Sequence, residues 1–267
     1  MNTESSKSLM LALDALRGNF RTTEYPLILG GLIYLRWAET QDENPGNDSH
    51  YKPILPASLH WSSWHKMPSA ELAIFLRSQL LPALINLEDA AEGTIPFHLR
   101  MFGKSLDDFL QLSEESLSGI IQWLSEQPFD SATDRRKLLS VFDDLLLSSY
   151  SHHGLEAATP ISLSKLVVSL ANPEPEDKIY DPCFGFAHFL TSACNINKGF
   201  SCDLNLTGIE RNFQTYLIGL VRLILAGAGK AQLQLGDSIG SSFEDSPAGS
   251  EFDFVLAHPP WNMKINP

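Results

Sequence analysis

The chain has 267 residues, enough to bury a sizeable core and to form one large domain or two modest ones. Hydrophobic residues make up 43% and charged residues 19%, which is typical of globular proteins. The formal net charge of -13 argues against a chain that grips nucleic acid alone, because such proteins present a basic face to the phosphates.

The cysteine count and the hydropathy of the chain indicate in which cellular compartment the protein would work. The three cysteines, Cys183, Cys194 and Cys202, are an odd count, and the amino terminus meets charges at Asp14 and Arg17 before a secretory leader could form. We therefore expect no disulfide framework and a reducing cytoplasm. No apolar run approaches the length needed to cross a bilayer, so we expect no membrane segment. The spacing of histidines and cysteines fits no zinc pattern, and we predict no metal site.

The first half of the chain has helical periodicity. Residues 8–40 predict two helices joined by a short turn, with Thr22 or Thr23 as N-cap of the second. Further helical patterns cover residues 69–87, 114–126 and 132–149. No strand-like alternation precedes about residue 175, so residues 1–150 are predicted to form a helical domain.

The pattern changes in the second half. After one more predicted helix at 162–171, four short apolar runs, KIYDP, LTGIE, AQLQLGD and FDFVLAHPP, are separated in part by helical patterns at 187–195 and 212–226. The fourth run predicts a buried strand at 252–257. Strands that alternate with helices predict a parallel sheet with a ligand crevice at the strands' carboxyl ends. Residues 151–267 are therefore predicted to form a second, α/β domain.

Polar residues close each predicted strand. After Asp181, Gly185 would let the backbone turn sharply and approach a nucleoside-type ligand beside a helix N-terminus, although an ordinary strand-to-helix turn would look the same. Glu210 could accept hydrogen bonds from ribose hydroxyls, or be a solvated residue paired with Arg211. Asp237 could meet the amino edge of an adenine, or bond the backbone of its own turn.

The loop after the fourth strand is the most informative segment. It reads His258, Pro259, Pro260 and Trp261. The prolines stiffen the loop, its carbonyls and the His258 side chain can bind an exocyclic amino group, and Trp261 can stack on a base extruded from a duplex. The alternative is a hydrophobic strand that simply ends in two prolines.

The order of these elements resembles the adenine-N6 methyltransferases that serve as modification subunits of type I restriction systems. In that family the cofactor turn reads roughly Asp-Pro-Ala-Cys-Gly-Ser-Gly-Gly-Phe-Leu and the catalytic loop reads Asn-Pro-Pro-Phe; DPCFGFAHFL and HPPW are similar to these. GLEAATPISLSKLVVSL resembles the family's Gly-x-Phe-x-Thr-Pro stretch, and ALRGNFRTTEYPLILGGLIYLRWAE its opening helical pair. The likeness covers nearly the whole chain.

The resemblance implies a helical domain followed by a Rossmann-like S-adenosylmethionine-dependent methyltransferase sheet, and methyl transfer from S-adenosylmethionine to adenine N6 in DNA. It implies that a specificity subunit reads the DNA sequence, that a restriction subunit joins where the system has one, and that DNA is held mainly through these partners. The cofactor-binding residues that it implies are Thr159, Pro160, Asp181, Gly185, Glu210 and Asp237. His258, Pro259, Pro260 and Trp261 would receive the flipped base.

Three departures from the family pattern bear on activity. Ala187 and His188 replace turn glycines, and His258 replaces the usual Asn or Asp; a neutral imidazole can accept a hydrogen bond and a protonated one cannot. The sheet of this fold normally has seven strands and only four are counted, so we expect a partial methyltransferase domain. A degenerate methyltransferase that docks partners without catalysis is the alternative. A methyltransferase of RNA or protein is a weaker one, because the amino-terminal likeness favours DNA.

Overall fold

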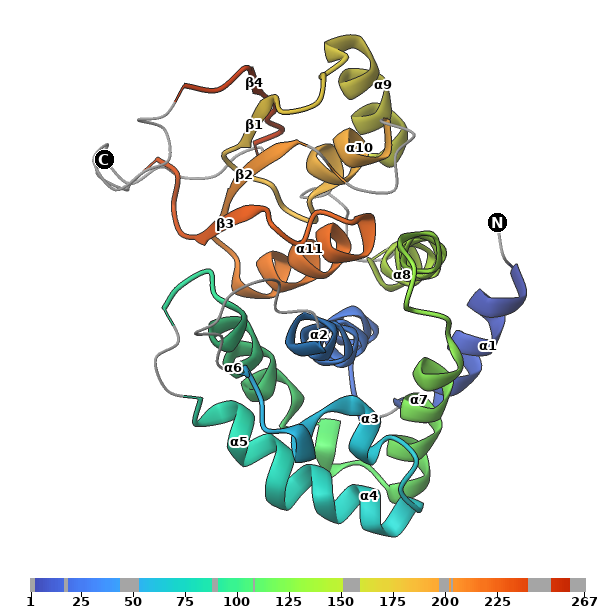
Figure 1. Cartoon of the computed structure of the whole chain (residues 1–267). Coiled ribbons are helices and arrows are strands. Elements are labelled where there is room, and N and C mark those ends of the chain that lie inside the picture. The colour runs from blue at the N-terminus through green and yellow to red at the C-terminus, as the bar shows by residue number, and fades with distance from the viewer. Residues whose placement is uncertain are drawn as a thin grey trace. The chain divides into compact units, whose positions relative to one another are not determined.

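The computed structural model describes residues 3–16, 19–43, 53–87, 91–107, 109–150, 159–196, 202, 204–239 and 251–259. The chain divides into two compact units (Figure 1). Unit 1 comprises Met1–Pro128 and Asp144–Ser149, and unit 2 comprises Phe129–Asp143 and Tyr150–Pro267. Both units draw residues from α8 (Ala132–Tyr150), so the boundary after residue 150 stays a prediction.

Unit 1 contains the helices α1 to α7 and short 3-10 turns between them. Their bounds are α1 Thr3–Leu13, α2 Tyr25–Glu43, α3 Trp61–Trp64, α4 Ser69–Phe75, α5 Leu81–Ile85, α6 Ile95–Leu106 and α7 Glu114–Glu126. The predicted helical character of this half is confirmed. The single pattern over 69–87 is divided by a π-helical turn, Leu76–Leu80, and α6 was not predicted.

The predicted cap of the second helix is wrong. Thr22 and Thr23 lie inside a 3-10 turn, Thr22–Glu24, and α2 begins after it at Tyr25. The turn is closed by Glu24, whose Oε2 accepts a hydrogen bond from the Arg21 N–H at 2.7 Å. A glutamate placed to reach back to the start of the turn therefore does the capping expected of a threonine hydroxyl.

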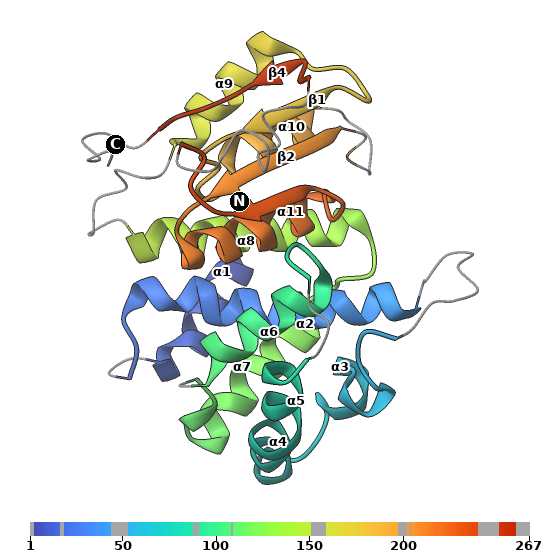
Figure 2. The same cartoon turned by 90° about the vertical axis from the view of Figure 1, so that its left-hand side faces the viewer.

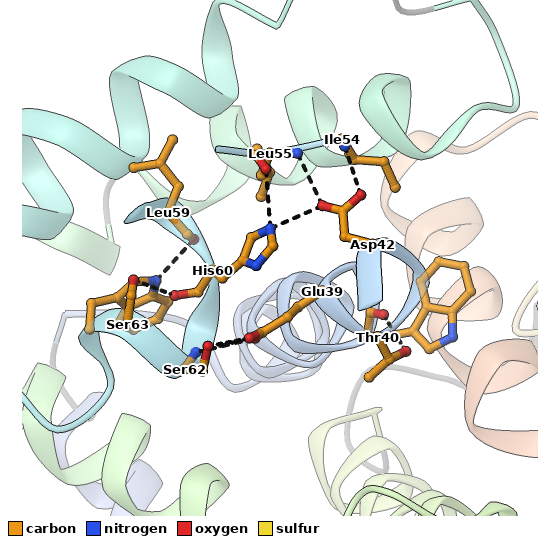
Figure 3. A network of polar contacts seen from close by, with 11 residues as sticks. Glu39, Thr40, Asp42, Ile54, Leu55, Leu59, His60, Ser62 and Ser63 are labelled. Atoms are coloured by element: carbon orange, nitrogen blue, oxygen red, sulfur yellow. Dashed lines mark hydrogen bonds and ion pairs between the residues drawn. The ribbon is translucent and has the colours of Figure 1, made fainter. Parts of the chain in front are cut away.

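Polar contacts tie the end of α2 to the segment that follows it (Figure 3). The Glu39 carboxylate accepts hydrogen bonds from the N–H and hydroxyl of Ser62, and Asp42 Oδ1 accepts one from the Ile54 N–H at 2.7 Å. His60 Nε2 lies 3.1 Å from Asp42 Oδ2. Trp64 follows in α3 and is fully buried, so it packs in the core of the helical unit.

Unit 2 is built on the predicted parallel sheet. Its strands are β1 Lys178–Asp181, β2 Asn205–Glu210, β3 Gln232–Leu235 and β4 Phe254–Val255, in the order β3-β2-β1-β4 (Figure 2). All three strand pairs are parallel. The accompanying helices are α9 Ile161–Ala171, α10 His188–Ile196 and α11 Phe213–Ala226, close to the predicted ranges.

The fourth strand differs from its prediction. It has two residues instead of six and lies at an edge of the described sheet, where Val255 is 61% exposed. Apolar character alone predicted burial, but an edge position leaves one side of a strand without a neighbour among the described strands.

The cysteines also correct an expectation. Cys194 in α10 and Cys202 form a disulfide, with their Cα atoms 5.0 Å apart, and Cys183 is a free cysteine. An odd count could not reveal this pair, because the pairing depends on the path that brings Cys202 back to the end of α10. No helix in the described part of the chain has both the length and the apolar character to span a membrane.

Candidate cofactor and target-base site

The four parallel strands bring their carboxyl ends to one edge of the sheet, the edge where such sheets bind ligands. Asp181 is the last residue of β1 and Glu210 the last of β2. Asp237 follows β3 and His258 follows β4. The predicted strand-end residues therefore all lie along this edge.

The turn after β1 is hydrogen-bonded to the end of β2. Asp181 is buried, and its Oδ1 accepts a hydrogen bond from the Cys183 N–H at 3.1 Å. The Gly185 N–H donates to Glu210 Oε2 at 2.9 Å. Gly185 has a φ of 56°, in the left-handed region that favours glycine. The turn and the Glu210 carboxylate thus form one connected unit.

Glu210 is bound to backbone and not to its neighbour Arg211. Its second oxygen, Oε1, accepts from the Asn212 N–H at 2.7 Å, just before α11 begins. Arg211 pairs instead with Asp237, its Nη1 3.5 Å from Asp237 Oδ2. The structure therefore shows the half-buried Glu210 as an oriented acceptor at the end of β2.

Asp237 makes the local contact considered in its alternative interpretation. Its Oδ1 accepts a hydrogen bond from the Ile239 N–H at 3.1 Å, which closes a turn after β3. Its side chain is 46% exposed and pairs with Arg211. The predicted contact with a cofactor adenine stays a prediction.

Burial changes the ionisation of the turn. It raises the pKa of Asp181 to about 7. The hydrogen bond from Cys183 lowers this pKa, and the negative charge of Glu210 raises it. Burial, followed by the charge of Asp181, raises the pKa of the Cys183 thiol to about 12. Cys183 is therefore a neutral thiol here, not a nucleophile.

The two residues that replace turn glycines have distinct surroundings. Ala187 has a φ of 57°, a conformation that costs a non-glycine residue about 1–2 kcal/mol. His188 is buried at the start of α10 with its ring edge-on to Phe186. Burial, followed by the positive charge of Arg222, lowers the pKa of His188 to about 2, so its imidazole is neutral.

Thr159 and His258 are brought together although they lie far apart in the sequence. The Thr159 hydroxyl oxygen is 3.1 Å from His258 Nδ1. The backbone of His258 also makes a hydrogen bond with Cys183, one of the influences on that thiol. The loop after β4 is thus joined both to the start of α9 and to the turn after β1.

The remaining predicted residues are only partly described. Pro160 is the N-cap residue of α9 and Pro259 is exposed beyond His258. Pro260 and Trp261 lie outside the described residues. Among the residues that the structure describes, no cluster of three or more His, Cys, Asp or Glu side chains could hold a metal ion.

Sequence reasoning missed Arg222, a buried cation in α11. Its Nε donates to Asp143 Oδ1 of α8 at 2.7 Å, and its Nη1 donates to the Phe186 carbonyl in the turn after β1. A lone arginine in the otherwise apolar stretch LIGLVRLILA was the available signal, because a buried arginine requires a partner.

Comparison with known proteins agrees with this geometry. Residues 140–266 match the family model described as N-6 DNA Methylase. The chain is similar to the Type I restriction enzyme MjaVII methylase subunit of Methanocaldococcus jannaschii, at 24% identity over 206 residues, covering 75% of this chain and 34% of that protein. It is also similar to the MjaVIII methylase subunit of that organism, at 33% identity over 115 residues, covering 40% of this chain and 20% of the relative.

A solved structure shares the fold. A chain in a structure that describes the complex assembly and conformational transition of a type I R-M system superposes with a TM-score of 0.78, at 23% identity, over 96% of this chain and 55% of that one. The present chain thus spans about a third or less of the two methylase subunits that it matches. Residues 140–266 thus match the model of the N-6 DNA methylase family, and the chain is similar in sequence to methylase subunits of type I restriction enzymes.

Proposed function

We propose that the chain is part of an S-adenosylmethionine-dependent DNA methyltransferase that modifies adenine N6, as a modification subunit of a type I restriction-modification system. The observation that supports this best is the hydrogen bond between the Gly185 N–H and the Glu210 carboxylate. It joins the turn and strand end to which the resemblance assigns the cofactor, inside the segment that matches the N-6 DNA methylase family.

The residues present fit this cofactor. Each Glu210 oxygen accepts one backbone N–H, which leaves lone pairs for two ribose hydroxyls. Gly185 keeps the turn free of a side chain, Thr159 and Pro160 would border the ligand, and Asp237 would exchange part of its present pairing for the adenine amino group. S-adenosylmethionine, when bound, supplies an electrophilic methyl group.

The loop after β4 would orient the target. His258 would accept a hydrogen bond from the exocyclic amino group, the carbonyls of Pro259 and Pro260 would accept another, and Trp261 would stack on the base. Little acid–base power is required of these residues, because holding the amino nitrogen in line with its methyl donor provides most of the rate.

Partners complete the proposal. The net charge of -13 gives the chain little electrostatic attraction for phosphates, so DNA would be held mainly by other subunits in the cytoplasm. A specificity subunit would read the sequence, and a restriction subunit would join where the system has one.

Calorimetric titration with S-adenosylmethionine tests the cofactor site. We expect saturable binding by the purified chain and a loss of affinity of about tenfold or more in Glu210→Gln, because an amide accepts fewer hydrogen bonds from ribose hydroxyls than a carboxylate does. Glu176→Gln is the matched control: this exposed glutamate precedes β1 at the opposite end of the strand, and its variant should bind like the wild type.

Equal affinity in Glu210→Gln and Glu176→Gln would contradict the assignment of Glu210 to the ribose. A folded chain that binds no S-adenosylmethionine would contradict the proposed cofactor site in this form of the protein. The docking module without catalysis, which the replacement of the family's Asn or Asp by His258 also allows, would then be the better hypothesis.

A further inference from the structure

The His258 ring has one nitrogen already engaged. Its Nδ1 lies 3.1 Å from the Thr159 hydroxyl oxygen, so Nε2 is the ring nitrogen left to meet a target base. The loop that carries the ring is held at two points by β1 and the turn after it. The Leu256 N–H donates to the Tyr180 carbonyl at 2.9 Å, and the His258 backbone makes a hydrogen bond with Cys183. A ring held in this way can act as an oriented hydrogen-bonding group.

The tautomer of the ring decides what it can do. A neutral imidazole has one N–H donor and one lone-pair acceptor, and the partner of one nitrogen sets the state of the other. If Thr159 donates to Nδ1, then Nε2 carries the hydrogen. If Nδ1–H donates to Thr159, then Nε2 offers a lone pair. A threonine hydroxyl permits both arrangements, because it can donate or accept.

Only the second arrangement suits an amino group that is to be alkylated. The two hydrogens of the amino group need acceptors, while its own lone pair must stay available to the methyl donor. An Nε2–H facing the amino group would either oppose those hydrogens or occupy that lone pair. An Asn or Asp at this position has an acceptor oxygen in any case, whereas a histidine becomes an acceptor only when its tautomer is set.

We propose that Thr159 is a positioning residue that acts as the hydrogen-bond acceptor of His258: the Nδ1–H donates to the Thr159 hydroxyl oxygen, which holds the ring in the tautomer whose Nε2 lone pair faces the target amino group. This inference rests on the proposed function. It gives Thr159 a task besides bordering the cofactor, and it explains how a histidine can stand where the family has Asn or Asp.

Nitrogen NMR of the purified chain, labelled with 15N-histidine and studied at a pH where the His258 ring is neutral, tests the inference. The His258 signals are identified by their absence from His258→Asn. We expect the wild type to show a protonated Nδ1 and an unprotonated Nε2. In Thr159→Val both nitrogens should shift toward values typical of mixed tautomers, and Thr159→Ser should restore the wild-type shifts. Thr40→Val is the control: the Thr40 hydroxyl donates to the Trp37 carbonyl and not to a histidine, so this variant should leave the His258 nitrogen shifts unchanged.

A wild-type ring that carries its hydrogen on Nε2 would overturn the inference, even if the valine variant fails to fold. Nitrogen shifts unchanged in a folded Thr159→Val would also overturn it. The measurement needs no cofactor and no activity, so its failure is distinct from the absence of S-adenosylmethionine binding, which would count against the proposed function.

Discussion

At the scale of single residues, the turn after β1 depends on a carboxyl group that is held out of water. Asp181 is 1% exposed and accepts the Cys183 N–H, so the group is fixed as an acceptor in the turn. Its pKa of about 7 means that it changes charge near neutrality, where an exposed aspartate would be fully ionised. Burial, and not a charged neighbour, is the first cause of this shift.

Asp181→Asn should therefore change the pH dependence of stability. Because the pKa of Asp181 is raised in the folded state, ionisation of this carboxyl group opposes folding. The protonated carboxyl group contributes its full stability below about pH 3.8, and this contribution is lost as the pH rises toward about 7. The full displacement corresponds to about 4 kcal/mol. We expect the free energy of unfolding of Asp181→Asn, measured by urea denaturation, to rise relative to that of the wild type as the pH increases from about 5 to about 8.

Other groups cancel in that comparison. His188, whose pKa is lowered in the folded state, contributes stability that is present above about 6.5 and is lost toward acid pH, in the wild type and in the variant alike. A difference between the two proteins that stays constant with pH would contradict the role given to Asp181.

At the scale of elements, α11 sets the shape of the turn through close packing. A Cβ on Gly219 would lie 2.7 Å from the Gly185 carbonyl oxygen and 2.7 Å from the Phe184 ring. Arg222, one turn further along the helix, donates to the Phe186 carbonyl. At this contact α11 therefore requires a glycine at position 219 and the buried Arg222, and the apolar pattern of the helix alone predicts neither.

Gly219→Ala should destabilise the chain by about 1–3 kcal/mol, because backbone atoms of the turn must move to admit the methyl group. It should also weaken S-adenosylmethionine binding if the turn that contains Gly185 holds the cofactor, as proposed above. Gly119→Ala in α7 is the matched control: nothing lies within 4 Å of the added Cβ, and alanine should stabilise that helix by about 0.5–1 kcal/mol. Thermal unfolding and calorimetry measure both effects, and similar stability changes in the two variants would rule out the tight contact.

At the scale of the whole chain, α8 supplies residues to both compact units. The α8 residues up to Asp143 belong to unit 2, where Asp143 is the partner of the buried Arg222. A division after residue 150, as the change of sequence pattern predicts, would separate these two charges. Breaking a fully buried ion pair typically costs about 3–5 kcal/mol, and because the Asp143 side chain is 23% exposed, we expect a cost toward the lower end of that range.

The two possible boundaries predict different behaviour of fragments. Residues 129–267 should be more stable than residues 151–267, by on the order of 3 kcal/mol, because only the longer fragment keeps Asp143 beside Arg222. Urea denaturation followed by circular dichroism compares them. Equal stability of the two fragments would favour the boundary at residue 150. Asp143→Asn in the longer fragment is the control, and it should remove part of that advantage.

The sequence by itself determined the helical character of the first half, the four strands and three helices of the parallel-sheet unit, and the polar residues at the strand ends. These follow from local periodicity and from the rule that parallel strands share one carboxyl edge, so no distant contact had to be known. The tertiary structure decided which side chains meet: Thr159 with His258 and Arg222 with Asp143, which lie far apart in the sequence, and Cys194 with Cys202, which are eight residues apart. It also placed β4 at an edge and closed the 3-10 turn before α2 with Glu24. Such features depend on where the folded backbone brings side chains together, and residue types alone carry no record of that path.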